Sequence, residues 1–122
     1  MEFGNFEQIK AGADLPFKDI EVPEWNCKVR ISSMTAGDRM KYETSVFEVD
    51  TGNAAGGKMK KKDFRSELVA RCMVDGSNKR LFNDDQIDIL SGKSANVLHR
   101  LFTEALEING MSKEVEAKIE KK

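Results

Sequence analysis

The sequence predicts an α+β fold in which an N-terminal antiparallel β-hairpin packs against a mainly helical body of four to five helices. Residues 17–32 carry apolar side chains at every second position, which is typical of half-buried strands. Further along the chain, apolar residues recur at spacings of three and four, which is typical of amphipathic helices. Leu, Ile, Val and Phe make up 29 of the 122 residues, so the chain can form one core of modest size.

The predicted hairpin reverses at Pro23. Proline cannot donate to a strand ladder and fixes its own φ, so residues 23–26 are the expected turn between the two strands. Lys28 and Arg30 alternate with the apolar residues of the second strand and should face solvent. The apolar positions of the hairpin are Ile20, Val22, Trp25, Cys27, Val29 and Ile31.

A first helix is predicted over residues 36–49. Thr35 provides an N-cap hydroxyl, and Asp38 places a carboxylate in the first turn, where the helix dipole favours it. Met40 and Phe47 lie along one side, but the apolar stripe is narrow. We therefore expect this helix to lie over the hairpin and to be only partly buried.

A second helix is predicted over residues 63–74. Phe64, Leu68 and Cys72 are spaced by four residues, which places them on one face of a helix. The Asp-Gly-Ser-Asn sequence at residues 75–78 is typical of a turn and should end the helix.

Two helices follow in the predicted body. A short helix is expected over residues 84–90 after a capping sequence. The helix over residues 95–109 has the widest apolar face in the chain, with Ser94 as its N-cap. The Asn-Gly pair at its end suits a left-handed C-terminal residue. This helix is the expected centre of the core.

These elements give one globular domain over residues 15–112, preceded by a partly ordered segment at residues 1–14. Residues 50–62 combine glycines and small residues with a lysine cluster, so we expect a flexible loop there. Residues 113–122 are expected to form a charged C-terminal helix or tail. The predicted core comprises Ile20, Val29, Ile31, Phe64, Leu68, Leu98, Leu101, Phe102 and Leu106.

The composition argues against several classes of protein. Twenty basic and 21 acidic residues give a net charge of −1, which disfavours a general attraction to nucleic acid or anionic membranes. Apolar runs are much shorter than the roughly 20 residues of a membrane span, and the N-terminus lacks the pattern of a signal peptide. We expect a cytosolic protein with neither nucleic acid nor membrane as a partner. Cys27 and Cys72 should stay reduced and pack in the core.

The residues give no candidate for catalysis, a cofactor or a metal ion. Gly52, Gly57 and Lys58 match part of the spacing of a phosphate-binding loop, but Met59 stands where a Ser or Thr hydroxyl would bind magnesium. A nucleotide-binding enzyme that uses this loop is an alternative that lacks this metal ligand. His99 is the single histidine, and no nucleophile lies in an evident active-site pattern near it.

Several short segments occur together between residues 15 and 112. They are Val-Pro-Glu-Trp at 22–25, Thr-Ala-Gly-Asp at 35–38, Val-Asp-Gly at 74–76, Leu-Phe at 81–82, Asp-Asp at 84–85 and Leu-Glu-Ile-Asn-Gly at 106–110. With these segments the chain resembles the tail assembly chaperones of long-tailed, siphovirus-type bacteriophages. The segments mark turns and helix ends, and none of them is a catalytic motif.

The resemblance implies a non-enzymatic assembly factor of the bacterial host's cytoplasm. Such a protein binds and solubilises the tape measure protein, promotes assembly of the tail tube protein around it, and is absent from the mature virion. In many of these phages, ribosomal frameshifting also gives a longer form, and this chain resembles the short one. The alternative is a small phage structural or head-tail connector protein that stays in the virion.

The six methionines suggest a surface that contacts an extended partner, because flexible thioether side chains fit varied apolar surfaces. We predict weak, repeated contacts, with self-association presenting several copies along the partner. Ordinary packing is the alternative, since helical spacing does not separate the two roles. The predicted contacts are Met40, Phe47, Met111, Val115 and Ile119.

Overall fold

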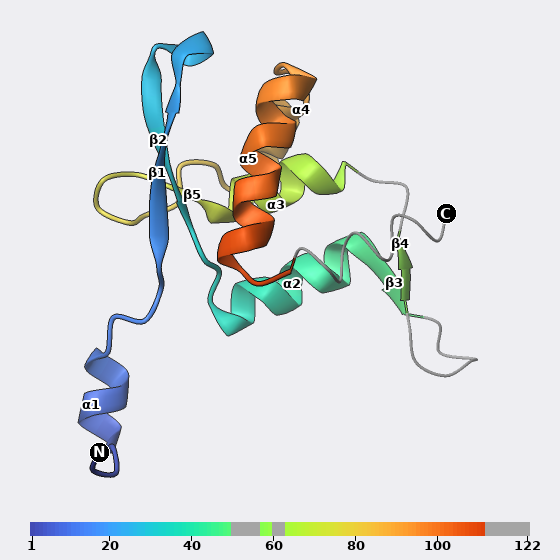
Figure 1. Cartoon of the computed structure of the whole chain (residues 1–122). Helices are drawn as coiled ribbons and strands as arrows, with labels where there is room; N and C mark the ends of the chain where they lie inside the picture. Colours follow the sequence, from blue (N-terminus) through green and yellow to red (C-terminus); the bar gives the residue numbers. More distant parts are fainter. Residues whose placement is uncertain (50–56, 60–62, 112–122) are drawn as a thin grey trace.

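The computed structural model of the chain describes residues 1–49, 57–59 and 63–111 (Figure 1). A three-stranded sheet stands on one side of a body of helices, and a short N-terminal helix lies apart from both. The predicted α+β class, with an N-terminal hairpin packed against a mainly helical body, is confirmed.

The sheet has the strand order β1 (Phe17–Val22), β2 (Cys27–Ser32) and β5 (Met73–Val74), with both pairings antiparallel. A 3₁₀ turn at Pro23–Trp25 joins the first two strands. Asn26 closes this turn with φ at 55°, a left-handed conformation that asparagine adopts more readily than most residues. The predicted hairpin and its turn are therefore confirmed.

The outer face of the hairpin is held together by Arg30. Its Nε donates a hydrogen bond to Asp19 Oδ1 at 2.8 Å, and its guanidinium carbon lies 3.9 Å from the ring centre of Phe17. Its Nη1 also donates to Asn78 Oδ1 at 3.1 Å. Arg30 lies on the solvent side as predicted, but these contacts leave its side chain only 22% exposed. It joins β1 and β2 to the turn after β5.

The third strand corrects the predicted end of the helix over residues 63–74. α3 (Phe64–Cys72) ends two residues earlier, and the next two residues form β5 opposite Arg30 and Ile31 of β2. The unpaired edge of β2 and the β-branched valine favour this pairing. The helical periodicity gives no sign of it, because the partner strand is distant in the sequence.

The helical body is centred on α3 and α5 (Ala95–Ile108). α5 packs against α3 and across β2, while α3 also contacts α2 (Ala36–Val46) and α4 (Ile87–Ser91). The side chains of Asp63 and Ser94 cap α3 and α5 by accepting backbone N–H bonds of their first turns. The predicted helices over residues 84–90 and 95–109 are confirmed to within one residue, and the first of them begins as a 3₁₀ turn.

The structure also corrects the predicted helix over residues 36–49. α2 ends at Val46, and the chain continues as β3 (Phe47–Val49), which pairs antiparallel with β4 (Gly57–Met59). The sequence at this point is Val-Phe-Glu-Val, and it favours a strand because valine is β-branched and phenylalanine is aromatic. Within the predicted loop over residues 50–62, residues 57–59 form the strand β4. The other residues of this range lie outside the described part of the chain.

The core lies between the sheet, α3 and α5. Seven of the nine predicted core residues are buried, and the other two, Ile20 and Phe64, are half-buried and pack against the core. Phe64 meets the ring of Phe102 edge to face, with ring centres 5.6 Å apart. Tyr42 and Val46 of α2 are fully buried, so the apolar side of this helix differs from the predicted one.

Candidate partner-binding surface

The predicted partner contacts have different positions in the structure. Met40 lies on the solvent side of α2, with 68% of its surface exposed. Phe47 is the first residue of β3. Val115 and Ile119 lie outside the described residues. Met40 is thus a predicted contact that the structure places at the surface.

The structure corrects the prediction that Met111 contacts a partner, because its side chain is buried in the core and only 1% exposed. Gly110 adopts φ at 65°, and this left-handed residue turns the chain back over the end of α5. The Met111 N–H donates to the Leu106 carbonyl at 2.8 Å, and the Gly110 N–H donates to the Glu107 carbonyl at 3.1 Å. This pair of bonds is a Schellman motif, which brings the following residue onto the last apolar turn. Met111 therefore packs inside the domain and is not available to a partner.

The N-terminal arm, residues 1–11, carries exposed apolar side chains that the sequence did not single out. It contains α1 (Phe6–Ala11), all of whose residues are exposed. Asn5 Oδ1 accepts the Gln8 N–H at 2.9 Å, and Gln8 Oε1 accepts the Asn5 N–H at 3.0 Å. This capping box is the signal that would have predicted the helix. The large exposed apolar residues of the arm are Met1, Phe3, Phe6 and Ile9.

A second apolar feature, the hairpin groove, is an open hollow of about 410 Å³ beside the turn between β1 and β2. Trp25 enters it from the 3₁₀ turn, and Leu81 and Phe82 enter it from the segment after β5. Cys27 also lines it and is exposed, which corrects the prediction that this thiol packs in the core. Cys27 is the first residue of β2 and stands at the open, turn end of the strand. The groove is lined by Trp25, Cys27, Val29, Met73, Leu81, Phe82, Leu90 and Lys93.

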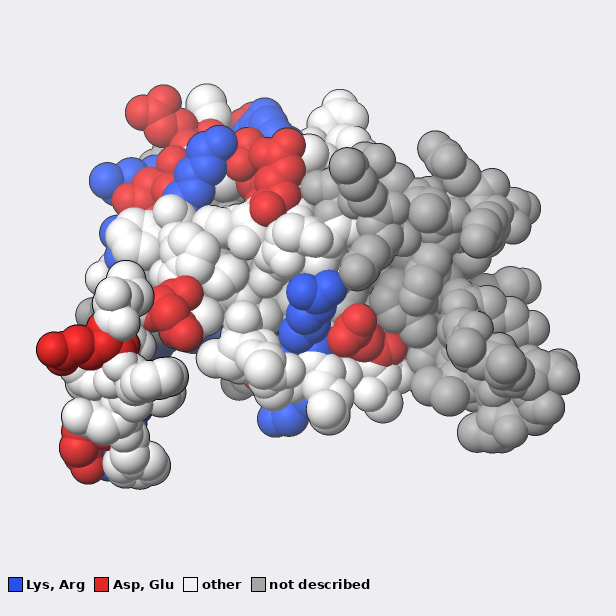
Figure 2. All heavy atoms as spheres, turned by 60° about the horizontal axis from the view of Figure 1, so that its bottom comes forward, with Lys and Arg blue, Asp and Glu red and all other residues white. Residues whose placement is uncertain are grey.

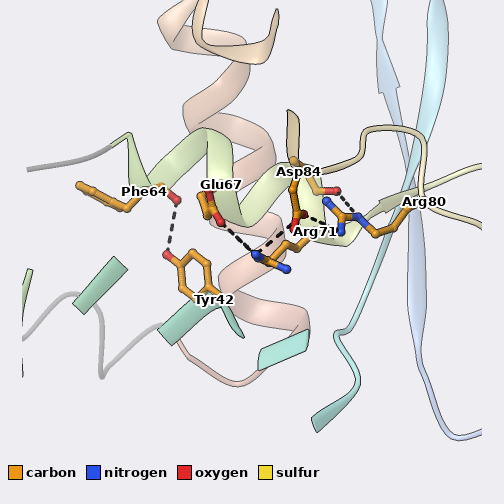
Figure 3. Close-up of polar contacts among 7 residues, drawn as sticks. Tyr42, Phe64, Glu67, Arg71, Arg80 and Asp84 are labelled. Carbon is orange, nitrogen blue, oxygen red and sulfur yellow. Dashed lines mark hydrogen bonds and ion pairs between the residues drawn. The ribbon is translucent and has the colours of Figure 1, made fainter. Parts of the chain in front are cut away.

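A polar network fastens the segment after β5 to α3 (Figure 3). Arg71 Nη2 donates to Glu67 Oε1 at 3.1 Å, with both side chains buried, and lies 3.9 Å from Asp84 Oδ1. Arg80 Nη1 donates to the same Asp84 oxygen at 3.1 Å. Arg71 Nη1 and Arg80 Nη2 are buried without a hydrogen-bond partner among the described residues. Both arginines line a hollow of about 320 Å³ that has room for water, so we assign the network a structural role.

The described residues offer little for catalysis. Within the described ranges, no group of three or more His, Cys, Asp or Glu is placed to hold a metal ion, and no helix is long and apolar enough to cross a membrane. His99 is exposed on α5. Burial raises the pKa of the Cys72 thiol to about 12, so it stays protonated at neutral pH and is a poor nucleophile. Of the three residues that resemble a phosphate-binding loop, Gly57 and Lys58 belong to β4 and Gly52 is not described.

The fold and surface define a small α+β domain with apolar side chains exposed on an arm, on α2 and in a groove. The chain belongs to the phage tail assembly chaperone family, whose model matches residues 11–121. The solved structure of the bacteriophage HK97 tail assembly chaperone is similar to it, with a TM-score of 0.56 and 18% sequence identity. That match covers 84% of this chain and 90% of the HK97 chain, and it shows a shared fold. A comparison with curated proteins found no match. The resemblance to the chaperones of siphovirus-type phages is confirmed.

Proposed function

We propose that this chain is a non-catalytic chaperone that binds the tape measure protein and keeps it soluble in the cytoplasm of the bacterial host. It promotes assembly of the tail tube protein around the tape measure protein and leaves before the virion is complete. The observation that carries the proposal is the family match, which extends over residues 11–121 and so includes the whole sheet and helical body. Self-association presents several copies along the extended partner.

The outer side of α2 is the proposed contact surface for the tape measure protein. Met40 is 68% exposed there, whereas Tyr42 and Val46 of the same helix are fully buried and hold it on the body. A flexible thioether on a fixed helix can fit apolar side chains of different shapes. Phe47, Val115 and Ile119 remain proposed contacts.

Co-expression tests this proposal. The tape measure protein is expressed alone, with this chain, or with its Met40→Asp variant, and the soluble fraction is measured after centrifugation. We expect this chain to raise the soluble fraction and Met40→Asp to lower that gain. Ile89→Asp is the matched control, because Ile89 is 52% exposed on α4, away from α2. If the tape measure protein is neither bound nor kept soluble by the unmodified chain, the chaperone proposal is wrong.

The alternative, a structural or connector protein retained in the virion, makes a different prediction. Mass spectrometry of purified particles should find the tube and tape measure proteins but not this chain. Its presence at a fixed number of copies per particle would favour the connector instead. Pull-down of the tube protein by the complex of chaperone and tape measure protein tests the remaining part of the proposal.

A further inference from the structure

β1 is a free edge of the three-stranded sheet. Its neighbour is β2, and the described residues place no strand on its other side. The opposite edge of the sheet is closed by the segment after β5. Arg80 forms an antiparallel bridge with Val74 of β5. The next residue, Leu81, donates its N–H to the Met73 carbonyl at 3.2 Å.

The register of the hairpin identifies the backbone groups that this free edge presents. Ser33, directly after β2, donates its N–H to the carbonyl of Pro16, directly before β1, at 2.9 Å. Bonded and non-bonded pairs alternate along an antiparallel ladder, so the even-numbered residues of β1 bond to β2 and the odd-numbered ones direct their N–H and C=O groups outward. These outward groups have no hydrogen-bond partner among the described residues. They belong to Phe17, Asp19 and Glu21.

The N-terminal arm leaves this edge uncovered. The hydrogen bonds of its backbone stay local, with the Ile9 N–H donating to the Asn5 carbonyl and the Gly12 N–H donating to the Ile9 carbonyl. In Figure 1, α1 lies below the start of β1, and Figure 2 shows the arm as a projection at the lower left. The outward residues of β1 are exposed, so their row of donors and acceptors is accessible.

β1 has few of the features that protect a free edge from other strands, such as a proline, a bulge or an unpaired lysine. It pairs with β2 over six residues without a bulge and contains no proline. The Lys18 ammonium lies 2.9 Å from Glu104 of α5. The Asp19 carboxylate accepts a hydrogen bond from Arg30 at 2.8 Å. Both charges are thus engaged within the domain, and a free edge of this kind is suited to an added strand.

We propose that β1 binds an extended segment of the tape measure protein as an added strand of the sheet. The inference rests on the proposed function, which makes that protein the partner. A segment of about five residues without proline would form up to about six backbone hydrogen bonds with the outward groups of β1. Binding through the backbone tolerates many side chains, which suits a chaperone that contacts a long partner at several places.

The side chains of β1 do not favour pairing with β1 of a second copy. Outward residues of one strand must meet outward residues of the other, which leaves few antiparallel registers. On the solvent face, each register that pairs at least two of them places Asp19 or Glu21 opposite an acidic residue or Phe17 of the other copy. No pair on that face is of opposite charge, and like charges directly opposite each other destabilise a sheet. A different polypeptide is free of this restriction.

Hydrogen exchange tests the geometry residue by residue and needs no substitution. Exchange of the full chain, free and in its complex with the tape measure protein, is quenched and read by NMR. We expect the outward amides of β1 to exchange at least about tenfold more slowly in the complex. The amides of Ile20 and Val22, which already bond to β2, are the internal control and should change little. Unchanged exchange of the outward amides in the complex overturns the inference, as does equal protection in the free chain at high concentration, which would assign the edge to a second copy.

A matched pair of variants at Glu21 tests the use of the edge. Glu21→Pro removes one outward N–H, whereas Glu21→Ala removes the same carboxylate and keeps that N–H. Edge strands tolerate proline where the N–H faces solvent, and circular dichroism verifies that both variants are folded. In co-expression, we expect Glu21→Pro to lose at least about half of the gain in soluble tape measure protein, because the added strand loses a bond and meets the proline ring. Glu21→Ala should match the unmodified chain.

The outcomes separate this inference from the proposed function. If both Glu21 variants keep as much tape measure protein soluble as the unmodified chain, or if both lose equally, the backbone edge is not the contact. The inference is then wrong and the chaperone proposal stands. If the unmodified chain itself does not keep the tape measure protein soluble, the proposed function is wrong and the inference falls with it.

Discussion

Asn109, at the end of α5, accepts a hydrogen bond at 2.7 Å through its Oδ1 from the backbone N–H of Met34, which follows β2. Its Nδ2 donates to the Ala105 carbonyl at 2.8 Å and to the Cys72 sulfur at 3.4 Å. One amide side chain therefore joins the exit of the hairpin to α5 and α3. An amide suits this position because it combines an acceptor and two donors.

Replacing Asn109 by alanine should lower the free energy of unfolding by about 1–3 kcal/mol, because the Met34 N–H loses its acceptor in a partly buried site. Urea unfolding followed by circular dichroism measures the loss. Asn109→Asp keeps the acceptor but removes the donors, so its stability should lie between those of the alanine variant and the unmodified chain. An alanine variant as stable as the unmodified chain would show that the bond contributes nothing.

Gly110→Ala should destabilise the domain by about 1–2 kcal/mol, because a side chain at φ 65° meets the penalty of left-handed backbone. Gly76→Ala is the matched control, since Gly76 has open space around it and no positive φ, and its effect should stay within about 0.5 kcal/mol. Chemical unfolding of both variants gives the comparison. If they lose equal stability, the Schellman turn is not what places Met111 in the core.

The parts of the fold that sequence predicts well are those with local signals. Period-two alternation around a proline gave the hairpin, and the wide stripe of α5 gave the centre of the core, because both patterns are set by residues close in sequence. α1 also has a local signal, the capping box of Asn5 and Gln8. β5 had none, since its two residues form a strand only by pairing with β2.

The candidate surface was harder to predict than the core. The burial of Met111 follows from the Asn-Gly pair, because the left-handed turn at Gly110 brings the next side chain onto the core. The hairpin groove combines Trp25 with Leu81 and Phe82, which are distant in the sequence. Only the folded arrangement brings them together. Met40 is exposed on α2, and its contact with a partner stays a prediction.

Leu101→Ala should cost about 2–5 kcal/mol, because Leu101 is fully buried where α5 packs in the core, and truncation leaves a cavity. Ile89→Ala removes apolar atoms from a half-exposed position on α4 and should change stability by less than about 0.5 kcal/mol. The midpoints of thermal unfolding should separate in the same order. A Leu101 variant that unfolds at the same midpoint as the Ile89 variant would place the core elsewhere.

Arg71→Met should destabilise the domain by about 3–5 kcal/mol, because it removes the charge that faces the buried carboxylate of Glu67. Arg80→Met is the control with a similar change of shape. Arg80 is paired with Asp84, whose side chain is 65% exposed, so water replaces much of the lost interaction and the loss should be smaller. Urea unfolding decides between them. A larger loss of stability for Arg80→Met than for Arg71→Met would show that the exposed ion pair contributes more than the buried one.

The two cysteines should differ sharply in reactivity. Cys27 is exposed, whereas Cys72 is 1% exposed, and burial raises its pKa from 9.0 to about 12. At pH 8 a thiol reagent should modify one cysteine in the folded chain and both in urea, with peptide mass spectrometry assigning the first to Cys27. The raised pKa also makes the free energy of unfolding depend on pH. Above pH 9 the unfolded chain releases the Cys72 proton while the folded chain retains it, so this group lowers stability as pH rises from about 9 to 12. The Cys72→Ala variant should lose that part of the alkaline pH dependence. Modification of both thiols at equal rates in the folded chain would mean that the core around Cys72 opens readily.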